Sequence, residues 1–261
     1  MIVVKFGGHA MKDENGNFAK AISAALATGE KVVVVHGGGP QIDAALKAKH
    51  IESQWIGGFR VTTQEIFDVV EDVLVNQVGH QVAATLSKSG IKAQAISARA
   101  LPTVIAQRRT SLIDGTPADL GFVGDVQSVN PAQLLQLLEQ GIVPVVAPVS
   151  SDVDLKTGLN VNADFAAAAI AASLEASALI VMTDVAGIYR NWPDKSSLIE
   201  SICAEELESI KSAFAEGMAP KVQAALDALS FGAKAVRIID GTDPDSFASA
   251  LAGTGGTLVV A

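Results

Sequence analysis

The chain has 261 residues, a formal net charge of −9, and a composition that is 49% hydrophobic but only 5% aromatic. This length allows one large α/β domain or two closely packed lobes around an aliphatic core. The negative charge argues against nucleic acid or an anionic membrane as a partner, and the single cysteine, Cys203, excludes an intrachain disulfide and a cysteine metal cluster.

An apolar strand over residues 2–6 opens the chain, and the glycines Gly7 and Gly8 follow it. No signal-peptide features precede the strand, and no apolar run approaches the roughly 18 residues of a membrane span. We therefore expect a cytoplasmic protein without a membrane partner. Lys5 lies at the carboxyl end of this strand, where open α/β sheets bind their ligands. It is either a snorkelling edge lysine or a ligand-binding group.

A helix over residues 18–28 leads to a second strand, in which the four valines of residues 32–35 end at His36. Three glycines, residues 37–39, follow without a break, and Pro40 can occupy the first turn of the next helix. This order exposes several backbone N–H groups at one point and predicts an anion site. The spacing fits neither a Walker phosphate loop nor a dinucleotide-binding fingerprint. A tight structural turn is the alternative.

A glycine-hinged loop or hairpin is expected at residues 55–62, where Thr62 begins a capping-box pattern with Glu65. The pattern predicts one long amphipathic helix over residues 62–89. His80 lies on its polar face, but no second metal-type residue is spaced to join it, so we assign no metal site.

The middle of the chain is predicted to hold short elements. We expect strands at residues 93–97, 103–107 and 142–146, a helix at 131–140, a glycine-flanked turn at 121–125 and a polar excursion at 151–159. The alternation of strands and helices predicts a parallel sheet whose glycine turns share one edge.

Three polar residues open an alanine-rich helix that runs to Leu174. Asn160, Asn162 and Asp164 are ordinary helix caps by type. Three such residues within five positions exceed what one cap needs.

In the last third, Thr183 and Asp184 follow a strand at residues 179–182, and Lys221 lies at the start of a helix that continues over residues 222–230. Lysine at a helix N-terminus opposes the helix dipole unless an anion lies in front of it. The remaining predicted elements are a helix at 205–214 and strands at 235–239 and 257–260.

Six blocks of the sequence, in this order, resemble the amino-acid kinase family over essentially the whole chain: residues 5–8, 36–39, 58–62, 160–164, 183–187 and 217–222. The resemblance implies a three-layer α/β/α sandwich with a central, mainly parallel sheet and two lobes. Residues 1–172 would bind the acid substrate and dimerise, and residues 173–261 would bind ATP. One continuous domain is the alternative.

The resemblance is greatest to family members that phosphorylate the γ-carboxylate of N-acetyl-L-glutamate with ATP, in arginine biosynthesis. A γ-carboxylate, with a pKa of about 4.3, is already ionised at pH 7, so no general base is required. Catalysis then consists of positioning and positive charge around the transferred phosphoryl group. Mg²⁺ would bridge the ATP phosphates with few or no protein ligands.

The resemblance also assigns roles to residues. Lys5 and Lys221 would stabilise the transferring phosphoryl group, and Asp164 would orient both lysines. The substrate-binding residues would be Gly38, Gly39, Arg60, Asn160 and Asn162. The nucleotide-binding residues would be Gly7, Gly8, Thr183, Asp184, Gly187 and Tyr189.

Other functions remain open at this point. A kinase of N-acylated aminoadipate or of aspartate would have similar blocks, because one methylene is worth only ~1–3 kcal/mol of discrimination. A non-catalytic sensor of nucleotides or amino acids could keep the glycine turns. Such a sensor has no need of Lys5, Asp164 and Lys221 together.

The resemblance further implies how the chains assemble. Family members that arginine inhibits carry an extra helix before the first strand, which joins dimers into a hexameric ring. Here the first strand begins at Ile2. We therefore expect a homodimer, paired through the helix at residues 62–89, whose activity does not respond to arginine.

Overall fold

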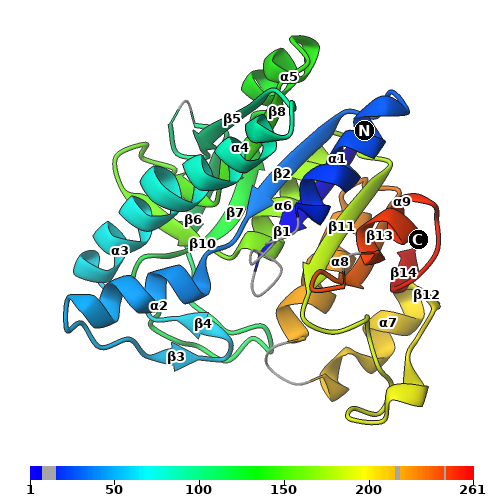
Figure 1. The fold of residues 1–261 in the computed structure, drawn as a ribbon. Helices are drawn as coiled ribbons and strands as arrows, with labels where there is room; N and C mark the ends of the chain where they lie inside the picture. The colour runs from blue at the N-terminus through cyan, green and yellow to red at the C-terminus, as the bar shows by residue number, and fades with distance from the viewer. Residues whose placement is uncertain (8–15, 101, 215–217, 244) are drawn as a thin grey trace.

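The computed structural model describes residues 1–7, 16–100, 102–214, 218–243 and 245–261. Within these residues, eight strands form a central sheet (Figure 1). In sheet order they are β12 (Ser201–Cys203), β14 (Thr257–Val260), β13 (Ala235–Asp240), β11 (Ala178–Thr183), β1 (Ile2–Phe6), β2 (Val32–His36), β8 (Val143–Ala147) and β5 (Ala93–Ser97). Neighbouring strands are parallel except β13 and β14, which are antiparallel. This confirms the predicted mainly parallel sheet.

Helices cover both faces of the sheet, as the sandwich architecture requires. One face carries α5 (Ala132–Glu139), α6 (Ala163–Ser173), α7 (Ala204–Ile210) and α8 (Ala219–Ser230). The other face carries α1 (Asn17–Ala27), α2 (Gly39–Ala48), α3 (Gln64–Glu71), α4 (Gly79–Lys88) and α9 (Ser246–Leu251). Among the described residues, no helix has the length and apolar character needed to cross a membrane.

The two faces have separate hydrophobic cores, and the central strands contribute to both. In β1, Val3 packs in the core beneath α6 and α8, whereas Val4 packs in the opposite core. Because successive side chains point to opposite faces, a strand buried on both sides must be continuously apolar. The runs of valine and isoleucine in β1 and β2 therefore specify the middle of the sheet.

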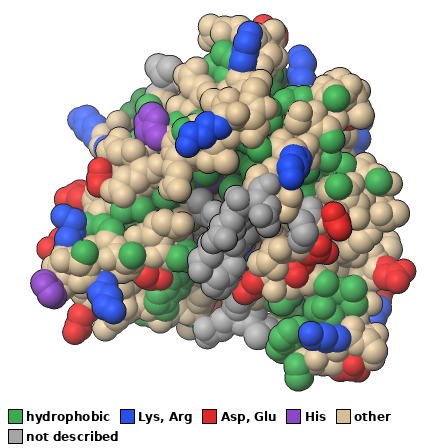
Figure 2. Space-filling view, viewed as in Figure 1, with side chains coloured by type: hydrophobic (Ala, Val, Ile, Leu, Met, Phe, Trp, Pro, Cys, Tyr) green, Lys and Arg blue, Asp and Glu red, His purple; other side chains and the backbone are tan. Residues whose placement is uncertain are grey.

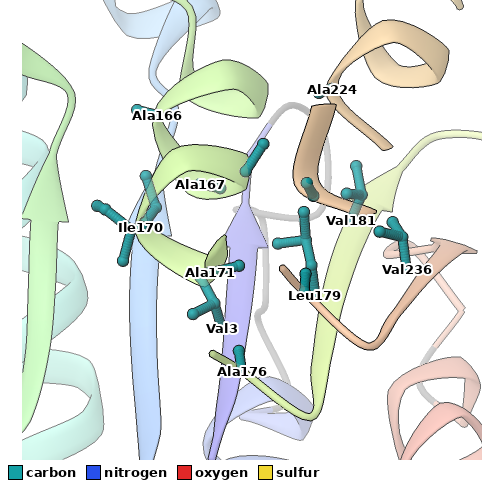
Figure 3. Close-up of a cluster of buried hydrophobic side chains, with 14 of the residues drawn as sticks. Val3, Ala166, Ala167, Ile170, Ala171, Ala176, Leu179, Val181, Ala224 and Val236 are labelled. Atoms are coloured by element: carbon teal, nitrogen blue, oxygen red, sulfur yellow. The ribbon is translucent and has the colours of Figure 1, made fainter. Parts of the chain in front are cut away.

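Alanines bring α6 close to β1. Figure 3 shows Ala167 and Ala171 of α6 beside Val3, with Leu179 and Val181 of β11 next to them. Small side chains at these positions let the helix approach the sheet closely, which holds its N-terminus near the carboxyl end of β1. The packing of α6 thus determines where its first residues lie.

Four further strands form a small closed barrel beside the sheet: β6 (Val104–Arg108), β7 (Val123–Val129), β9 (Val149–Asp152) and β10 (Gly158–Val161). The predicted turn at residues 121–125 and polar excursion at 151–159 were therefore wrong in part. Strand β10 pairs with β7, far away in sequence, and the serines of β9 are buried in the barrel. These polar residues concealed the strand pattern in the sequence.

The predicted hairpin is present as β3 (Trp55–Ile56) and β4 (Phe59–Arg60), an antiparallel pair. It lies at one end of the molecule, beside α2 (Figure 1). The sheet continues through the β1–β11 pair, which joins the two halves of the chain. The division into lobes at residues 172 and 173 stays a prediction.

The predicted long helix is continuous but not uniform. It consists of α3, a π-helical segment at Asp72–Val78, and α4. The predicted capping box was wrong, because Thr63 caps the helix through its Oγ1, which accepts a hydrogen bond from the Ile66 N–H. Thr62 is instead buried beside Gly121, and its hydroxyl donates to the carbonyl of Arg60.

Candidate active site

Three charged side chains from different elements meet at the carboxyl end of β1. Lys5 Nζ lies 3.1 Å from Asp164 Oδ1, and Lys221 Nζ lies 3.2 Å from Asp164 Oδ2. Lys5 is the next-to-last residue of β1, Asp164 lies in the first turn of α6, and Lys221 lies in the first turn of α8. We call these three residues the charged triad. Each carboxylate oxygen thus holds one ammonium group.

Burial and charge oppose each other in the triad. Burial alone would raise the pKa of Asp164, but the neighbouring charges of Lys5 and Lys221 outweigh it and lower this pKa to about 2. Asp164 is therefore ionised at neutral pH. Burial lowers the pKa of Lys5 below its ordinary value, and Lys221 acts in the same direction while Asp164 opposes it. An anionic ligand would favour the charged form of Lys5 again.

The positions of Asp164 and Lys221 follow from the local structure of their helices. Asn162 caps α6, and its side-chain oxygen accepts a hydrogen bond from the Asp164 N–H at 2.7 Å. Pro220 occupies the first turn of α8 and so places Lys221 there. The anion that offsets Lys221 at a helix N-terminus is the Asp164 carboxylate, together with any ligand that binds in front of it.

Two glycine turns lie beside the triad. Gly7 follows β1, and a Cβ atom there would lie 3.2 Å from Lys5 Cε and 3.3 Å from Lys5 Nζ. Glycine at this position therefore leaves room for the ammonium group. In the second turn, a Cβ atom at Gly38 would lie 2.5 Å from Leu74 Cδ2, whereas Gly39 has open space around it. Gly8 lies outside the described residues.

His36 supports the second glycine turn and does not take part in charge chemistry. Burial lowers its pKa to about 4, although its hydrogen bond to Gly37 acts in the opposite direction. The ring is therefore neutral at pH 7. Its Nδ1 lies 2.8 Å from the carbonyl oxygen of Gly37, to which it donates a hydrogen bond. This bond fixes the orientation of the first glycine.

A cavity of about 560 Å³ lies between the triad and the β3–β4 hairpin, and we call it the hairpin cavity. It contains every substrate-binding residue that the resemblance indicated: Gly38, Gly39, Arg60, Asn160 and Asn162. Trp55 also lines it, although the sequence analysis assigned no role to this residue. The five residues come from α2, β4, β10 and the cap of α6, so only the fold brings them together.

Arg60 presents a free donor at the hairpin cavity. Its Nη1 bonds to Asp43 at 2.8 Å and to Ser53 at 2.7 Å. The ring of Trp55 lies 4.5 Å from the guanidinium carbon. Among the described residues, the buried Nη2 has no hydrogen-bond partner. Since a buried unsatisfied donor is costly, a carboxylate ligand at Nη2 would be stabilised.

Thr62 orients Asn160 toward the same cavity. The Nδ2 of Asn160 donates to Thr62 Oγ1 at 3.1 Å, while the Thr62 hydroxyl donates to Arg60. Thr62 therefore links Arg60 and Asn160, which both line the cavity, through two hydrogen bonds. Thr62 was predicted to be a helix cap, but these two hydrogen bonds are the reason that a polar side chain is present at this buried position.

A second cavity, of about 800 Å³, lies on the other side of the triad, and we call it the aromatic cavity. Four predicted nucleotide-binding residues line it, namely Gly7, Thr183, Asp184 and Tyr189. Thr183 ends β11 and donates to Asp184 Oδ1 at 3.1 Å. Trp192, Phe214 and Met218 also line this cavity. None of them was a predicted site residue, because an apolar side chain in an irregular segment or at the end of a helix carries no signal of ligand binding by itself.

Gly187 does not line the aromatic cavity. A Cβ atom there would lie 2.5 Å from Thr257 Oγ1 and 2.9 Å from the Thr257 nitrogen. The same hydroxyl accepts a hydrogen bond from the Ile188 N–H at 2.8 Å. Close packing against β14 is therefore enough to explain why residue 187 is a glycine, and no contact with a ligand is needed.

Lys5 and Lys221 line both cavities. The charged triad therefore lies where two separate binding spaces meet. Among the described residues, no group of three His, Cys, Asp or Glu side chains could hold a metal ion. The chemistry that this arrangement supports is the transfer of an anionic group from one cavity to the other, under the charge of two lysines.

The family follows from a direct comparison. Residues 1–240 match the amino acid kinase family, which is more than nine-tenths of the chain. The chain therefore belongs to the amino acid kinase family.

Individual relatives show which members of the family the chain is similar to. The chain is 45% identical over 246 residues to an acetylglutamate kinase of Nocardia farcinica, covering 94% of this chain and 81% of the relative. It is 42% identical over 254 residues to an acetylglutamate kinase of Kineococcus radiotolerans, covering 94% and 85% of the two chains. Among solved structures, smu.665 of Streptococcus mutans superposes with a TM-score of 0.82 at 29% identity, covering 99% of this chain and 98% of the other.

The close packing at Gly187 gives a test of its role. We expect Gly187→Ala to lower the free energy of unfolding by about 1–3 kcal/mol, because the added methyl group overlaps Thr257. Thermal and denaturant unfolding measure this effect. Gly39→Ala is the control for unfolding, since a Cβ atom there meets nothing within 4 Å. Normal stability with weakened ADP binding in Gly187→Ala would instead support a nucleotide contact.

Proposed function

We propose that this protein transfers the γ-phosphoryl group of ATP to the γ-carboxylate of N-acetyl-L-glutamate, with N-acetyl-L-glutamyl 5-phosphate and ADP as products. The reaction is a step of arginine biosynthesis. Relatives that carry the name acetylglutamate kinase support the choice of acid. The observation that carries the proposal is that Lys5 and Lys221 line both cavities, with Asp164 between them.

In this proposal the two substrates approach the triad from opposite sides. The acid occupies the hairpin cavity with its γ-carboxylate toward the triad, and the nucleotide occupies the aromatic cavity with its phosphates toward Lys5, Gly7 and Lys221. A γ-carboxylate oxygen attacks the γ-phosphorus, and the bond from that phosphorus to the β-phosphate bridging oxygen breaks. The electron pair leaves with ADP. Both reactants are anions, so their repulsion is the main obstacle.

The two lysines reduce this repulsion by placing positive charge beside the transferred group. Asp164 is not a general base, because its pKa of about 2 leaves it unprotonated and weakly basic, and each of its oxygens already contacts a lysine. Its role is to hold two ammonium groups close together that would otherwise repel each other. The acid needs no base, since it reacts as a carboxylate.

The other end of the acid would bind at the wall of the hairpin cavity. The α-carboxylate would accept a hydrogen bond from the unpartnered Nη2 of Arg60 and from Asn160. Backbone N–H groups at Gly38 and Gly39 would support the γ-carboxylate and the phosphoryl group, because they lie at the N-terminus of α2. Asn162 lines the cavity while it caps α6.

ATP is the phosphoryl donor in this proposal, and a divalent metal ion accompanies it as in kinases generally. We further propose that this ion is Mg²⁺, bound through the phosphates and not through a protein cluster. The homodimer, the absence of nucleic-acid and membrane partners and the cytoplasmic location stay predictions from the sequence.

The acid specificity can be tested by measuring ADP release. We expect activity with N-acetyl-L-glutamate to exceed activity with N-acetylaminoadipate, aspartate, glutamate and carbamate. A higher kcat/KM for the aminoadipate derivative would reassign the substrate within the same chemistry. If the protein binds ADP but releases no ADP with any of these acids, a non-catalytic sensor of nucleotides or amino acids is favoured instead.

The lysines provide the first mutational test. Replacing Lys5 or Lys221 with Ala should lower kcat by ~10²–10³-fold, with a much smaller change in KM for the acid, because each charge acts mainly in the transition state. Steady-state kinetics with both substrates varied separate the two parameters. A variant with nearly normal kcat would remove that lysine from the chemistry. Lys211→Ala is the control, since Lys211 pairs with Glu208 and lines neither cavity.

Arg60 provides a test of the acid site. In Arg60→Lys the charge remains but the forked guanidinium is lost, so we expect KM for the acid to rise about tenfold or more while KM for ATP stays near that of the wild type. The same kinetic assay distinguishes the two substrates. A selective rise in KM for ATP would place Arg60 in the nucleotide site and contradict the assignment of the hairpin cavity.

A further inference from the structure

The proposed mechanism leaves one prominent side chain of the aromatic cavity without a role. Trp192 lies in the segment that joins β11 to β12 and is 62% exposed. Figure 2 shows hydrophobic side chains gathered at the lower right, over this part of the molecule. Single exposed hydrophobic residues are common on proteins. The exposure of Trp192 is informative because of the cavity that its ring borders.

The aromatic cavity has two chemically different ends. Lys5 and Lys221 provide positive charge at the triad, where phosphates would bind. Away from the triad the lining includes the aromatic side chains of Tyr189, Trp192 and Phe214, beside the polar Arg190 and Asn191. A nucleotide has the same division, because its phosphates are anionic and its base is a flat aromatic surface. The base therefore fits the end that Trp192 borders.

The ring of Trp192 makes an edge-to-face contact with the ring of Tyr189. Its centroid lies 5.3 Å from that of Tyr189, and the two planes meet at 63°. In an edge-to-face pair, the edge of one ring points at the face of the other, so broad ring surface stays uncovered. Aromatic side chains with a free face are the usual platforms for nucleobases.

Hydrogen bonds hold the segment around Trp192 in place. The N–H of Arg190 donates to the Ser197 carbonyl at 2.9 Å, and the N–H of Asn191 donates to Ser197 Oγ at 3.0 Å. The N–H of Asp194 donates to the Asn191 carbonyl at 2.8 Å. Arg190 also pairs with Glu206 at the start of α7. Because the backbone is fixed on both sides of Trp192, little order has to be gained when a ligand stacks on the ring.

We propose that Trp192 stacks on the base of the bound nucleotide and makes the enzyme prefer purine over pyrimidine nucleotides. The inference rests on the proposed function, since it requires a nucleotide in the aromatic cavity. A purine presents two fused rings to the indole, whereas a pyrimidine presents one. The purine therefore gains more from the contact.

Kinetics test the specificity. In Trp192→Ala we expect KM for ATP to rise at least about fivefold, which is the lower range for the loss of one base–aromatic contact. The kcat value and KM for the acid should stay near those of the wild type, and Trp192→Phe should recover most of the loss. The ratio of kcat/KM for ATP to that for CTP should fall in Trp192→Ala. A purely structural role would change neither this ratio nor KM for ATP selectively.

Fluorescence gives a direct reading, because the chain contains two tryptophans and they line different cavities. Trp55→Phe leaves Trp192 as the sole tryptophan, and ADP with Mg²⁺ should quench its emission in a saturable way. Trp192→Phe leaves Trp55, near the hairpin cavity, and is the matched control. Its emission should not respond to ADP.

Calorimetric titration of ADP distinguishes a failure of the proposed function from a failure of the role proposed for Trp192. A wild-type protein that does not bind ADP would overturn the proposed function and this inference with it. If the wild type binds ADP, and Trp192→Ala binds it equally well with an unchanged ATP-to-CTP ratio, the inference is wrong while the proposed function stands. Weakened ADP binding in Trp192→Ala, with an unchanged unfolding temperature, supports the inference.

Discussion

The structure depends on one buried carboxylate that holds two lysines. Asp164 is 5% exposed and contacts Lys5 and Lys221 through its two oxygens. Charges removed from water are expensive unless they are paired, and removing one partner of a buried pair typically costs about 3–5 kcal/mol. The N-termini of α6 and α8 and the carboxyl end of β1 must therefore meet at the same point for the fold to tolerate these groups. The alanines of α6 make this possible, because they let the helix lie close to β1 (Figure 3).

This arrangement also explains how one site can serve two substrates. The triad forms the boundary between the hairpin cavity and the aromatic cavity, and its lysines line both. The cavities differ in their walls. Arg60 and Asn160 give the first a set of polar donors suited to a carboxylate, while Tyr189 and Trp192 give the second a flat aromatic surface. Membership of the amino acid kinase family agrees with an anion transferred between the two spaces.

The sequence predicted the sheet and singled out the two lysines for physical reasons, whereas the pairing of both with Asp164 came from the family resemblance. The valines of β1 and β2 indicated buried strands. Lys5 stood at the carboxyl end of a strand, where ligands bind, and Lys221 stood where a lysine is unfavourable without an anion nearby. The barrel was harder to predict, because β9 and β10 have four residues each and pair across long stretches of chain. Thr62 appeared to be a helix cap, and only the structure shows its hydrogen bonds to Arg60 and Asn160. Trp192 lies in an irregular segment, so no periodic pattern marked it.

The role of the buried carboxylate can be tested by the kcat of Asp164→Asn, determined on protein whose unfolding temperature and ADP affinity are measured in the same preparation. Asparagine keeps the shape of the side chain but removes the charge that holds Lys5 and Lys221 together. We expect a folded protein that still binds ADP and whose kcat has fallen by ~10²–10³-fold. A folded Asp164→Asn variant with nearly wild-type kcat would contradict this role, because the two lysines would then be positioned without the carboxylate.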